Sequence, residues 1–249
     1  MNNSNIGIFD SGIGGATVLK EIIKILPKEN YIYCSDSKNN PYGDKSKDEI
    51  IKICSNNVDF LLEKKCKVIV IACNTASLIA TEGLRKKHEG IPIIAIEPAY
   101  KMVHDYAYDE PTLVMATKAT IESERFQLLY NKYNNHKTFL LPCSGLAEII
   151  EKNDKKKINQ YLEENIKQYS GKVKNVVLGC THYPLIQDEI KDILGNVTFF
   201  NGAANLAKNL KNILEKNGIQ NTTGNKKIEF IDTQNLTEKR ERFEEFLKN

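Results

Sequence analysis

Two cysteines in matching sequence surroundings are the residues best suited to chemistry in this chain of 249 residues. Cys73 follows the segment VIA (residues 70–72), and Cys180 follows the segment VLG (residues 177–179). Each cysteine precedes two polar residues and an amphipathic segment, so both thiols are predicted where a strand ends and a helix begins. The unpaired N–H groups and positive end of a helix lower the pKa of a thiol there. Such thiols could serve as two bases, one removing a proton from a carbon and one protonating the opposite face.

The similarity around these cysteines extends over two longer stretches. An offset of 107 residues places residues 70–75 and 78–79 on residues 177–182 and 185–186, and a weaker match places 8–11 on 114–117. We interpret the repeat as an internal duplication with two halves that face each other, although short strand-to-helix turns also resemble one another by chance. An enzyme that inverts a stereocentre suits this arrangement, because its substrate and product are mirror images.

Polar residues near the predicted strand ends could support these thiols. Asp10 and Ser11 end the first strand, and Asp10 could accept a hydrogen bond from a thiol or hold a substrate ammonium group. His182 lies two residues from Cys180 and could tune it. Neutral donors, together with helix N-termini, could bind carboxylates without arginine, although helix capping is the alternative and compatible role for each of them. These donors are Asn74, Thr75, Thr117, Thr120 and Thr181.

The other cysteines and histidines carry no comparable pattern. Their spacing matches no zinc-binding motif, so no metal site is predicted. We expect four cysteines to be small buried residues and three histidines to lie on the surface. These residues are Cys34, Cys54, Cys66 and Cys143, and His88, His104 and His136.

Short apolar runs alternate with longer amphipathic ones, and this alternation must position the polar residues. The pattern predicts an α/β fold of two pseudo-symmetric domains, each a mainly parallel sheet flanked by helices, with the active site in the cleft between them. The predicted strands are residues 5–9, 31–34, 68–72, 91–96, 112–116, 138–141, 173–179, 197–200 and 227–232. The predicted helices include residues 16–26, 48–65, 75–87, 121–132, 154–169, 203–216 and 237–248, and one that begins near Pro184.

The amino-acid composition argues against several classes of protein. The chain is 41% hydrophobic, which argues against disorder as its main state. Its 35 basic and 32 acidic residues give a net charge of +3, too balanced for a nucleic-acid binder defined by its charge. The longest apolar runs, residues 68–73 and 91–96, are far too short to span a membrane. The N-terminus does not resemble a secretion signal, so we expect a cytoplasmic protein with reduced thiols.

Four segments in this order resemble the glutamate racemase family. They are FDSGIGG (residues 9–15), PYG (41–43), VIACNTAS (70–77) and LGCTHYPL (178–185), and the resemblance covers about residues 5–232. The wider superfamily includes aspartate and hydantoin racemases, and the first two segments point to the glutamate branch. The resemblance implies a cofactor-independent enzyme that interconverts L- and D-glutamate and supplies D-glutamate for peptidoglycan synthesis. It also implies a domain formed by residues 1–96 plus 206–249 and a second formed by residues 97–205.

The same resemblance implies roles for individual residues. Cys73 and Cys180 would be the two acid/base thiols, the first acting on the D-enantiomer and the second on the L-enantiomer. A family carboxylate corresponds to Glu151, with Glu148 competing for the match. The expected partner is glutamate as a small-molecule substrate, without metal, cofactor, nucleic acid or membrane, and a homodimer is left open. The substrate site would be lined by Asp10, Ser11, Tyr42, Gly43, Asn74, Thr75, Thr117, Thr120, Thr181 and His182.

Three alternatives stay open from the sequence. An aspartate or related amino-acid racemase of the same superfamily would use the same residues. A dehydrogenase could bind a dinucleotide at Gly12, Gly14 and Gly15 with Asp36 on the ribose, although Thr17 stands where the fingerprint requires a third glycine. A periplasmic-type binding protein also has two α/β domains around a cleft, but the paired thiols argue against it.

Overall fold

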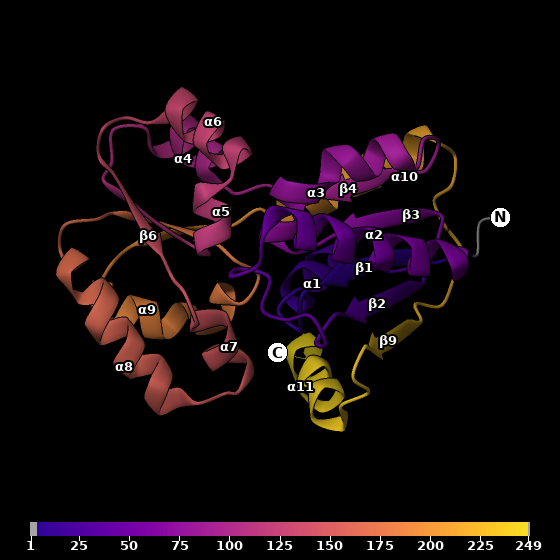
Figure 1. Ribbon diagram of the computed structural model, residues 1–249. Coiled ribbons are helices and arrows are strands. Elements are labelled where there is room, and N and C mark those ends of the chain that lie inside the picture. Colours follow the sequence, from indigo (N-terminus) through magenta and orange to yellow (C-terminus); the bar gives the residue numbers. More distant parts are fainter. Residues whose placement is uncertain (1–3, 249) are drawn as a thin grey trace.

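The computed structural model describes residues 4–248, in which two parallel β-sheets lie side by side with helices on their faces (Figure 1). The first sheet has the spatial order β4-β3-β1-β2-β9, and all its neighbouring strands pair in parallel. Its strands are β1 (Ile6–Asp10), β2 (Tyr31–Ser35), β3 (Val68–Ile71), β4 (Ile93–Ala95) and β9 (Ile228–Asp232).

The second sheet repeats this strand order. It reads β6-β5-β7-β8, again with parallel pairs, so that β5 to β8 take the places that β1 to β4 occupy in the first sheet. The register repeats as well, since Ile8 pairs with Val70 in the first sheet and Val114 pairs with Val177 in the second. The sequence offsets place Ile8 on Val114 and Val70 on Val177, so the repeated register agrees with an internal duplication. The strands are β5 (Thr112–Ala116), β6 (Thr138–Pro142), β7 (Asn175–Gly179) and β8 (Thr198–Phe200).

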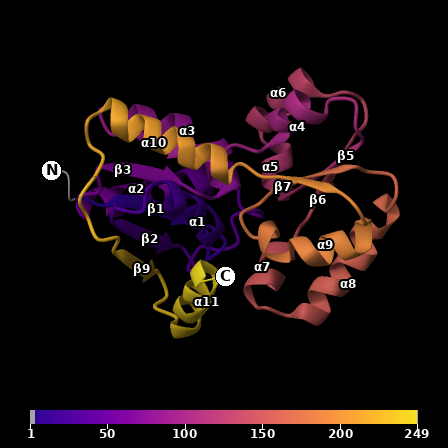
Figure 2. The same ribbon diagram turned by 180° about the vertical axis from the view of Figure 1, so that it is seen from behind.

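Helices cover both faces of the first sheet (Figures 1 and 2). Alternate residues of β1 separate the two layers, because Ile8 packs into the cluster with α1, α10 and α11 while Phe9 packs into the cluster with α2 and α3. Burial on both faces accounts for the near-continuous apolar strands, each buried aliphatic side chain contributing about 1.5–3 kcal/mol. The helices are α1 (Ala16–Ile25), α2 (Lys47–Glu63), α3 (Asn74–Lys87), α10 (Ala203–Lys216) and α11 (Thr237–Lys248).

The second sheet is covered in the same manner. Met115 of β5 packs into the cluster with α7, α8 and α9, and Val114 packs into the cluster with α4 and α6. The helices are α4 (Tyr100–Ala107), α5 (Lys118–Glu122), α6 (Glu124–Tyr133), α7 (Leu146–Glu151), α8 (Lys155–Ile166) and α9 (Gln187–Leu194). Two short 3₁₀ helices are η1 (Lys167–Tyr169) and η2 (Tyr183–Ile186).

The sequence prediction of the fold class is confirmed, with local differences. Helix α4 was not predicted. The single helix predicted over residues 121–132 is two helices, because Ser123 is extended and caps α6 by accepting a hydrogen bond from the Phe126 backbone. The helix predicted near Pro184 begins as η2, with its proline in the first turn. His88 is also not a surface residue, since its side chain is only 12% exposed and lies against Asp59.

The carboxyl ends of four equivalent strands converge on one place. Ser11 follows β1, Cys73 follows β3, Thr117 follows β5 and Cys180 follows β7, and all of them line the same cavity. Ligand sites of parallel sheets lie at such strand ends.

Within residues 4–248, the helices lack the combination of length and apolar character that a membrane crossing needs.

Candidate active site

A cavity of about 30 Å³ lies between the two sheets and is lined by both Cys73 and Cys180. Most of the residues predicted for the site line it. They are Ser11, Tyr42, Gly43, Asn74, Thr75, Thr117, Thr181 and His182, in addition to the two cysteines. Its volume leaves room for no more than a few water molecules.

Asp10, Thr120 and Glu151 do not line this cavity but support residues that do. The Asp10 carboxylate accepts hydrogen bonds from the Gly12 and Gly15 backbone at 3.1 and 3.2 Å, and from the Thr181 hydroxyl at 3.2 Å. Asp10 therefore connects the loop of residues 11–15, which we call the glycine loop, to the loop after β7 by hydrogen bonds.

Three threonine hydroxyls form a second contact between the halves. Thr120 lies 2.9 Å from Thr117 and 3.2 Å from Thr75, and the Thr75 and Thr117 hydroxyls are 2.9 Å apart. Thr117 also caps α5 by accepting a hydrogen bond from the Thr120 backbone, so capping and cavity lining coexist as the sequence suggested.

Sequence reasoning missed several lining residues. The loops after β2 and β6 contribute Asn40, Pro41, Asp44, Cys143, Ser144 and Gly145, while helices add Lys118, Ala147 and Glu148. The signal that could have found them is the rule already applied to the other strands, because β6 also ends at the cleft. Cys143 is buried as predicted, at 2% exposed, but it also faces the cavity.

The prediction that the helix N-terminus lowers the pKa of Cys73 is wrong. Cys73 is the N-cap of α3, as expected, and its sulfur lies 3.8 Å from the Ser11 hydroxyl. Burial nevertheless raises the pKa of Cys73 to about 12, and the nearby Asp10 carboxylate adds to the rise. Loss of water around a thiolate outweighs the stabilising backbone N–H of Ala76. Cys73 is therefore a protonated thiol in this closed site.

Cys180 has different surroundings. Its sulfur lies 3.6 Å from His182 Nδ1, and His182 Nε2 lies 2.9 Å from Glu151 Oε1. Burial alone would lower the pKa of His182, but Cys180 and Glu151 more than offset it, so this pKa is well above its ordinary value. An imidazolium thus lies against the Cys180 sulfur.

Glu151, rather than Glu148, is the carboxylate paired with His182. Burial would raise the pKa of Glu151, but the hydrogen bond from His182 and the charge of Lys239 lower it to about 2. Glu148 lies at the cavity rim with its side chain 48% exposed and bonded to Lys152 at 2.6 Å. The two carboxylates that the sequence left in competition therefore have separate surroundings.

Asp36 positions the loop that carries Tyr42. The Tyr42 hydroxyl donates to the Asp36 carboxylate at 2.5 Å, and Asn57 donates to both groups at 3.0 Å. Asp36 is thus bound to the interior of the protein, in contrast to the ribose ligand that a dehydrogenase would need.

The glycine loop after β1 accommodates side chains from the second half. A Cβ atom at Gly14 would lie 2.5 Å from His182 Nδ1, and one at Gly12 would collide with the Glu151 carboxylate. The space over this loop, where a dinucleotide would place its pyrophosphate, is filled by His182 and Glu151. The dinucleotide interpretation is therefore wrong.

Among residues 4–248, His, Cys, Asp and Glu side chains do not form a group that could hold a metal ion.

The family model and the related proteins that match this chain also indicate a racemase. A family model described as Asp/Glu/Hydantoin racemase matches residues 6–210. The chain belongs to this racemase family. It is 42% identical over 231 residues to a glutamate racemase of Clostridium perfringens, covering 91% of this chain and 89% of that protein. It is 44% identical over 231 residues to a glutamate racemase of Clostridium novyi, covering 90% and 89%.

Solved structures of this family share the fold over the whole chain. The glutamate racemase of Francisella tularensis, solved in complex with D-glutamate, superposes with a TM-score of 0.85 at 33% identity and covers 100% of this chain and 95% of that one. Glutamate racemase RacE1 of Bacillus anthracis gives a TM-score of 0.86 at 31% identity, covering 100% and 96%. The chain is therefore an isomerase of the racemase type.

The close approach at Gly14 gives a testable prediction. Gly14→Ala should lower kcat/KM for racemisation by on the order of 10²-fold, because the added methyl group displaces the His182 ring. The matched control is Gly83→Ala in α3, where an added Cβ would meet no described atom within 4 Å. Gly83→Ala should retain activity and stabilise the protein by roughly 0.5–1 kcal/mol. Equal activity of the two variants would contradict this account of the loop.

Proposed function

We propose that this chain interconverts L- and D-glutamate by a two-base mechanism in which Cys73 and Cys180 are the acid/base groups. The observation that carries the proposal is the shared cavity, which both thiols line from equivalent strand ends of the two repeated sheets. A substrate carbon held between them could be deprotonated on one face and protonated on the other.

In the proposed forward reaction, the Cys180 thiolate removes the α-proton of L-glutamate. The C–H electron pair stays on the substrate as a carbanion delocalised into the α-carboxylate, and the Cys73 thiol protonates the opposite face. Two features support this direction of transfer: Cys73 is protonated, and the His182 imidazolium faces the Cys180 sulfur. The reverse reaction exchanges the two roles.

The proposed substrate contacts are neutral donors. Ser11, Asn74, Thr75, Thr117 and Thr181 line the cavity and can donate to the two carboxylates of glutamate. Few water molecules can compete with these donors in so small a space, which strengthens the electrostatic stabilisation of the carbanionic transition state.

Substrate access requires the cavity to widen. At about 30 Å³ it is too small for an amino acid, so the walls must move apart and close again over the substrate. We propose that the moving parts are the domain of residues 1–96 plus 206–249 and the domain of residues 97–205. The contacts between Thr75 and Thr117 and between Asp10 and Thr181 would break and reform in this motion.

The choice of glutamate over aspartate is supported by the relatives, which are named glutamate racemases. The biological role that fits this activity is supply of D-glutamate for peptidoglycan synthesis in the cytoplasm, without a cofactor. A homodimer is compatible with the proposal, which does not require one.

The test is an assay of the purified protein with L-glutamate or L-aspartate, with no added nucleotide. We expect L-glutamate to reach an equal mixture of enantiomers, measured by loss of optical rotation, and aspartate to react more slowly. Racemisation of aspartate alone would move the assignment to an aspartate racemase. Glutamate binding without α-proton exchange would favour a binding protein and overturn the proposal.

A further inference from the structure

The C-terminal helix α11 reaches the Cys180 side of the site through one lysine. Lys239 Nζ contacts Glu151 Oε2 in an ion pair whose side chains are 14% and 3% exposed. Lys239 lies on a helix that covers the first sheet, and Glu151 lies on a helix that covers the second. The pair therefore joins α11 to α7 next to His182, which lines the cavity.

Lys239 completes the set of donors around the Glu151 carboxylate. Oε1 accepts hydrogen bonds from the Ile13 backbone and His182 at 2.9 Å, and Oε2 accepts one from Asn40 at 3.1 Å besides the contact with Lys239. A carboxylate offers about four acceptor positions, and here four donors occupy them. The orientation of Glu151, and with it that of His182, is therefore fixed partly by Lys239.

When Cys180 is a thiolate, its charge and that of the Glu151 carboxylate face the His182 imidazolium and the Lys239 ammonium group. The buried Asp10 carboxyl, whose pKa is raised by burial, also interacts with His182 and Glu151. Without Lys239, the same state would lose one of its positive charges in a largely buried place, which is costly because water screens charge poorly there. Lys239 thus helps to keep Glu151 ionised, and Glu151 holds the His182 ring that lies beside the Cys180 sulfur.

We propose that Lys239 is a positioning residue for the half-reaction at Cys180, acting through Glu151 and His182. This inference rests on the proposed function and deepens it, because it assigns part of the site to the C-terminal helix. The sulfur of Cys73 has the Ser11 hydroxyl as its hydrogen-bond partner, so the effect of Lys239 should be confined to one side of the substrate.

The one-sided effect defines the measurement. L- and D-glutamate have equal free energies, so kcat/KM must stay equal in the two directions in every variant. The deuterium isotope effect is not constrained in this way. With L-glutamate deuterated at Cα it reports on proton removal by Cys180, and with deuterated D-glutamate it reports on removal by Cys73.

We expect Lys239→Met to lower kcat/KM by on the order of 10- to 100-fold in both directions. The isotope effect on kcat/KM should rise for deuterated L-glutamate and fall for deuterated D-glutamate, because proton transfer at Cys180 becomes more rate-limiting. Lys239→Arg, which keeps the cation, should restore most of the activity and the wild-type isotope effects.

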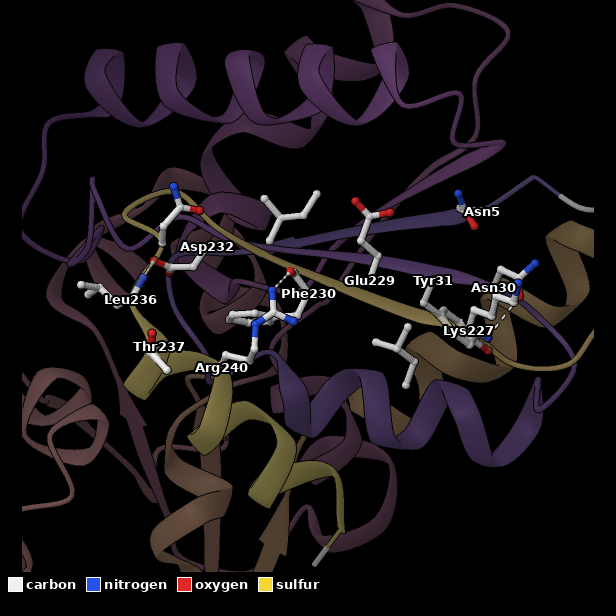
Figure 3. Close-up of a pocket in the computed structure, with 13 residues that line it drawn as sticks. Asn5, Asn30, Tyr31, Lys227, Glu229, Phe230, Asp232, Leu236, Thr237 and Arg240 are labelled. Atoms are coloured by element: carbon white, nitrogen blue, oxygen red, sulfur yellow. Dashed lines mark hydrogen bonds between the residues drawn. The ribbon is translucent and has the colours of Figure 1, made fainter.

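Arg240→Met is the matched control. Arg240 is the next residue of α11 and donates from Nη2 to the Phe230 carbonyl at 2.9 Å (Figure 3), so its loss disturbs how the helix packs on β9 without touching Glu151. Its isotope effects should equal those of the wild type. If Lys239→Met does not fold, Lys239→Gln, which removes the charge but keeps a hydrogen-bond donor for Glu151, should show the same rise with deuterated L-glutamate.

Two outcomes would overturn the role of Lys239: unchanged isotope effects in its variants, or the same shift in Arg240→Met. Failure of the proposed function has a different signature, since the wild type would then not racemise glutamate or Cys180→Ala would retain full activity.

Discussion

Replacement of either Cys73 or Cys180 by alanine is expected to lower kcat/KM for glutamate racemisation by about 10³-fold or more. Each variant lacks the only group placed to move a proton on one face of the substrate in the proposed mechanism, and a general acid or base contributes about 10²–10⁴-fold. The loss should appear in both directions, because each direction uses one thiol as base and the other as acid.

Cys66→Ala provides the control for these variants. Cys66 is also buried, and burial likewise raises its pKa to about 12, but it lies before β3 whereas Cys73 follows the same strand. Cys66→Ala should retain wild-type racemase activity, even if the substitution lowers the stability of the folded protein. Wild-type turnover by Cys73→Ala or Cys180→Ala, measured by chiral chromatography, would contradict the mechanism.

Glu151→Gln is expected to have the second-largest effect, on both activity and stability. The substitution keeps the shape of the side chain but leaves Lys239 and His182 without their anionic partner. Removing one partner of a buried ion pair lowers the free energy of unfolding by roughly 3–5 kcal/mol, because the other charge stays buried without a partner. Loss of the carboxylate that orients His182 should lower kcat/KM by on the order of 10²-fold.

The pH dependence of this stability loss has a definite sign. The pKa of Glu151 is about 2 in the folded protein and 4.5 ordinarily, so the ionised carboxylate stabilises the fold fully above pH 4.5. That stabilisation disappears as the pH falls from 4.5 towards 2. The pKa of His182 is raised, so its contribution is also stabilising but has the opposite pH dependence: it is fully present below the ordinary pKa of histidine and is lost as the pH rises through the raised pKa.

Urea unfolding of the wild type and Glu151→Gln at pH 7 and pH 3 tests this prediction. The difference in unfolding free energy should be smaller at pH 3 than at pH 7. Glu148→Gln is the stability control, because its exposed pair with Lys152 should contribute no more than about 1 kcal/mol. A Glu151→Gln difference that is absent at pH 7, or that grows as the pH falls, would contradict the assigned ion pairs.

Much of this site was predictable because it depends on strand ends. The apolar runs before Asp10, Cys73 and Cys180 are buried on both sides, and such runs have a clear sequence pattern. Parallel pairing then requires the residues after them to share one edge of the fold. The repeated offset also predicted two similar α/β halves, and the structure adds that they share one strand order.

Other features depend on tertiary packing and have no local signal. Glu148 and Glu151 are three residues apart on α7, and only the packing of that helix against the first half buries one and exposes the other. Lys239 lies 88 residues from its partner Glu151. The raised pKa of Cys73 follows from closure of the cavity, whereas the sequence revealed only the helix N-terminus beside it.

The decisive measurement follows the isotope at Cα when the wild-type protein acts on L-glutamate in D₂O during the first few per cent of reaction. Two thiols on opposite faces predict D-glutamate that carries deuterium, delivered by Cys73 after exchange with the solvent, while the remaining L-glutamate keeps its protium. Deuterium in the recovered L-glutamate, or protium retained in the D-glutamate product, would mean that a single group serves both faces and would contradict the two-thiol mechanism.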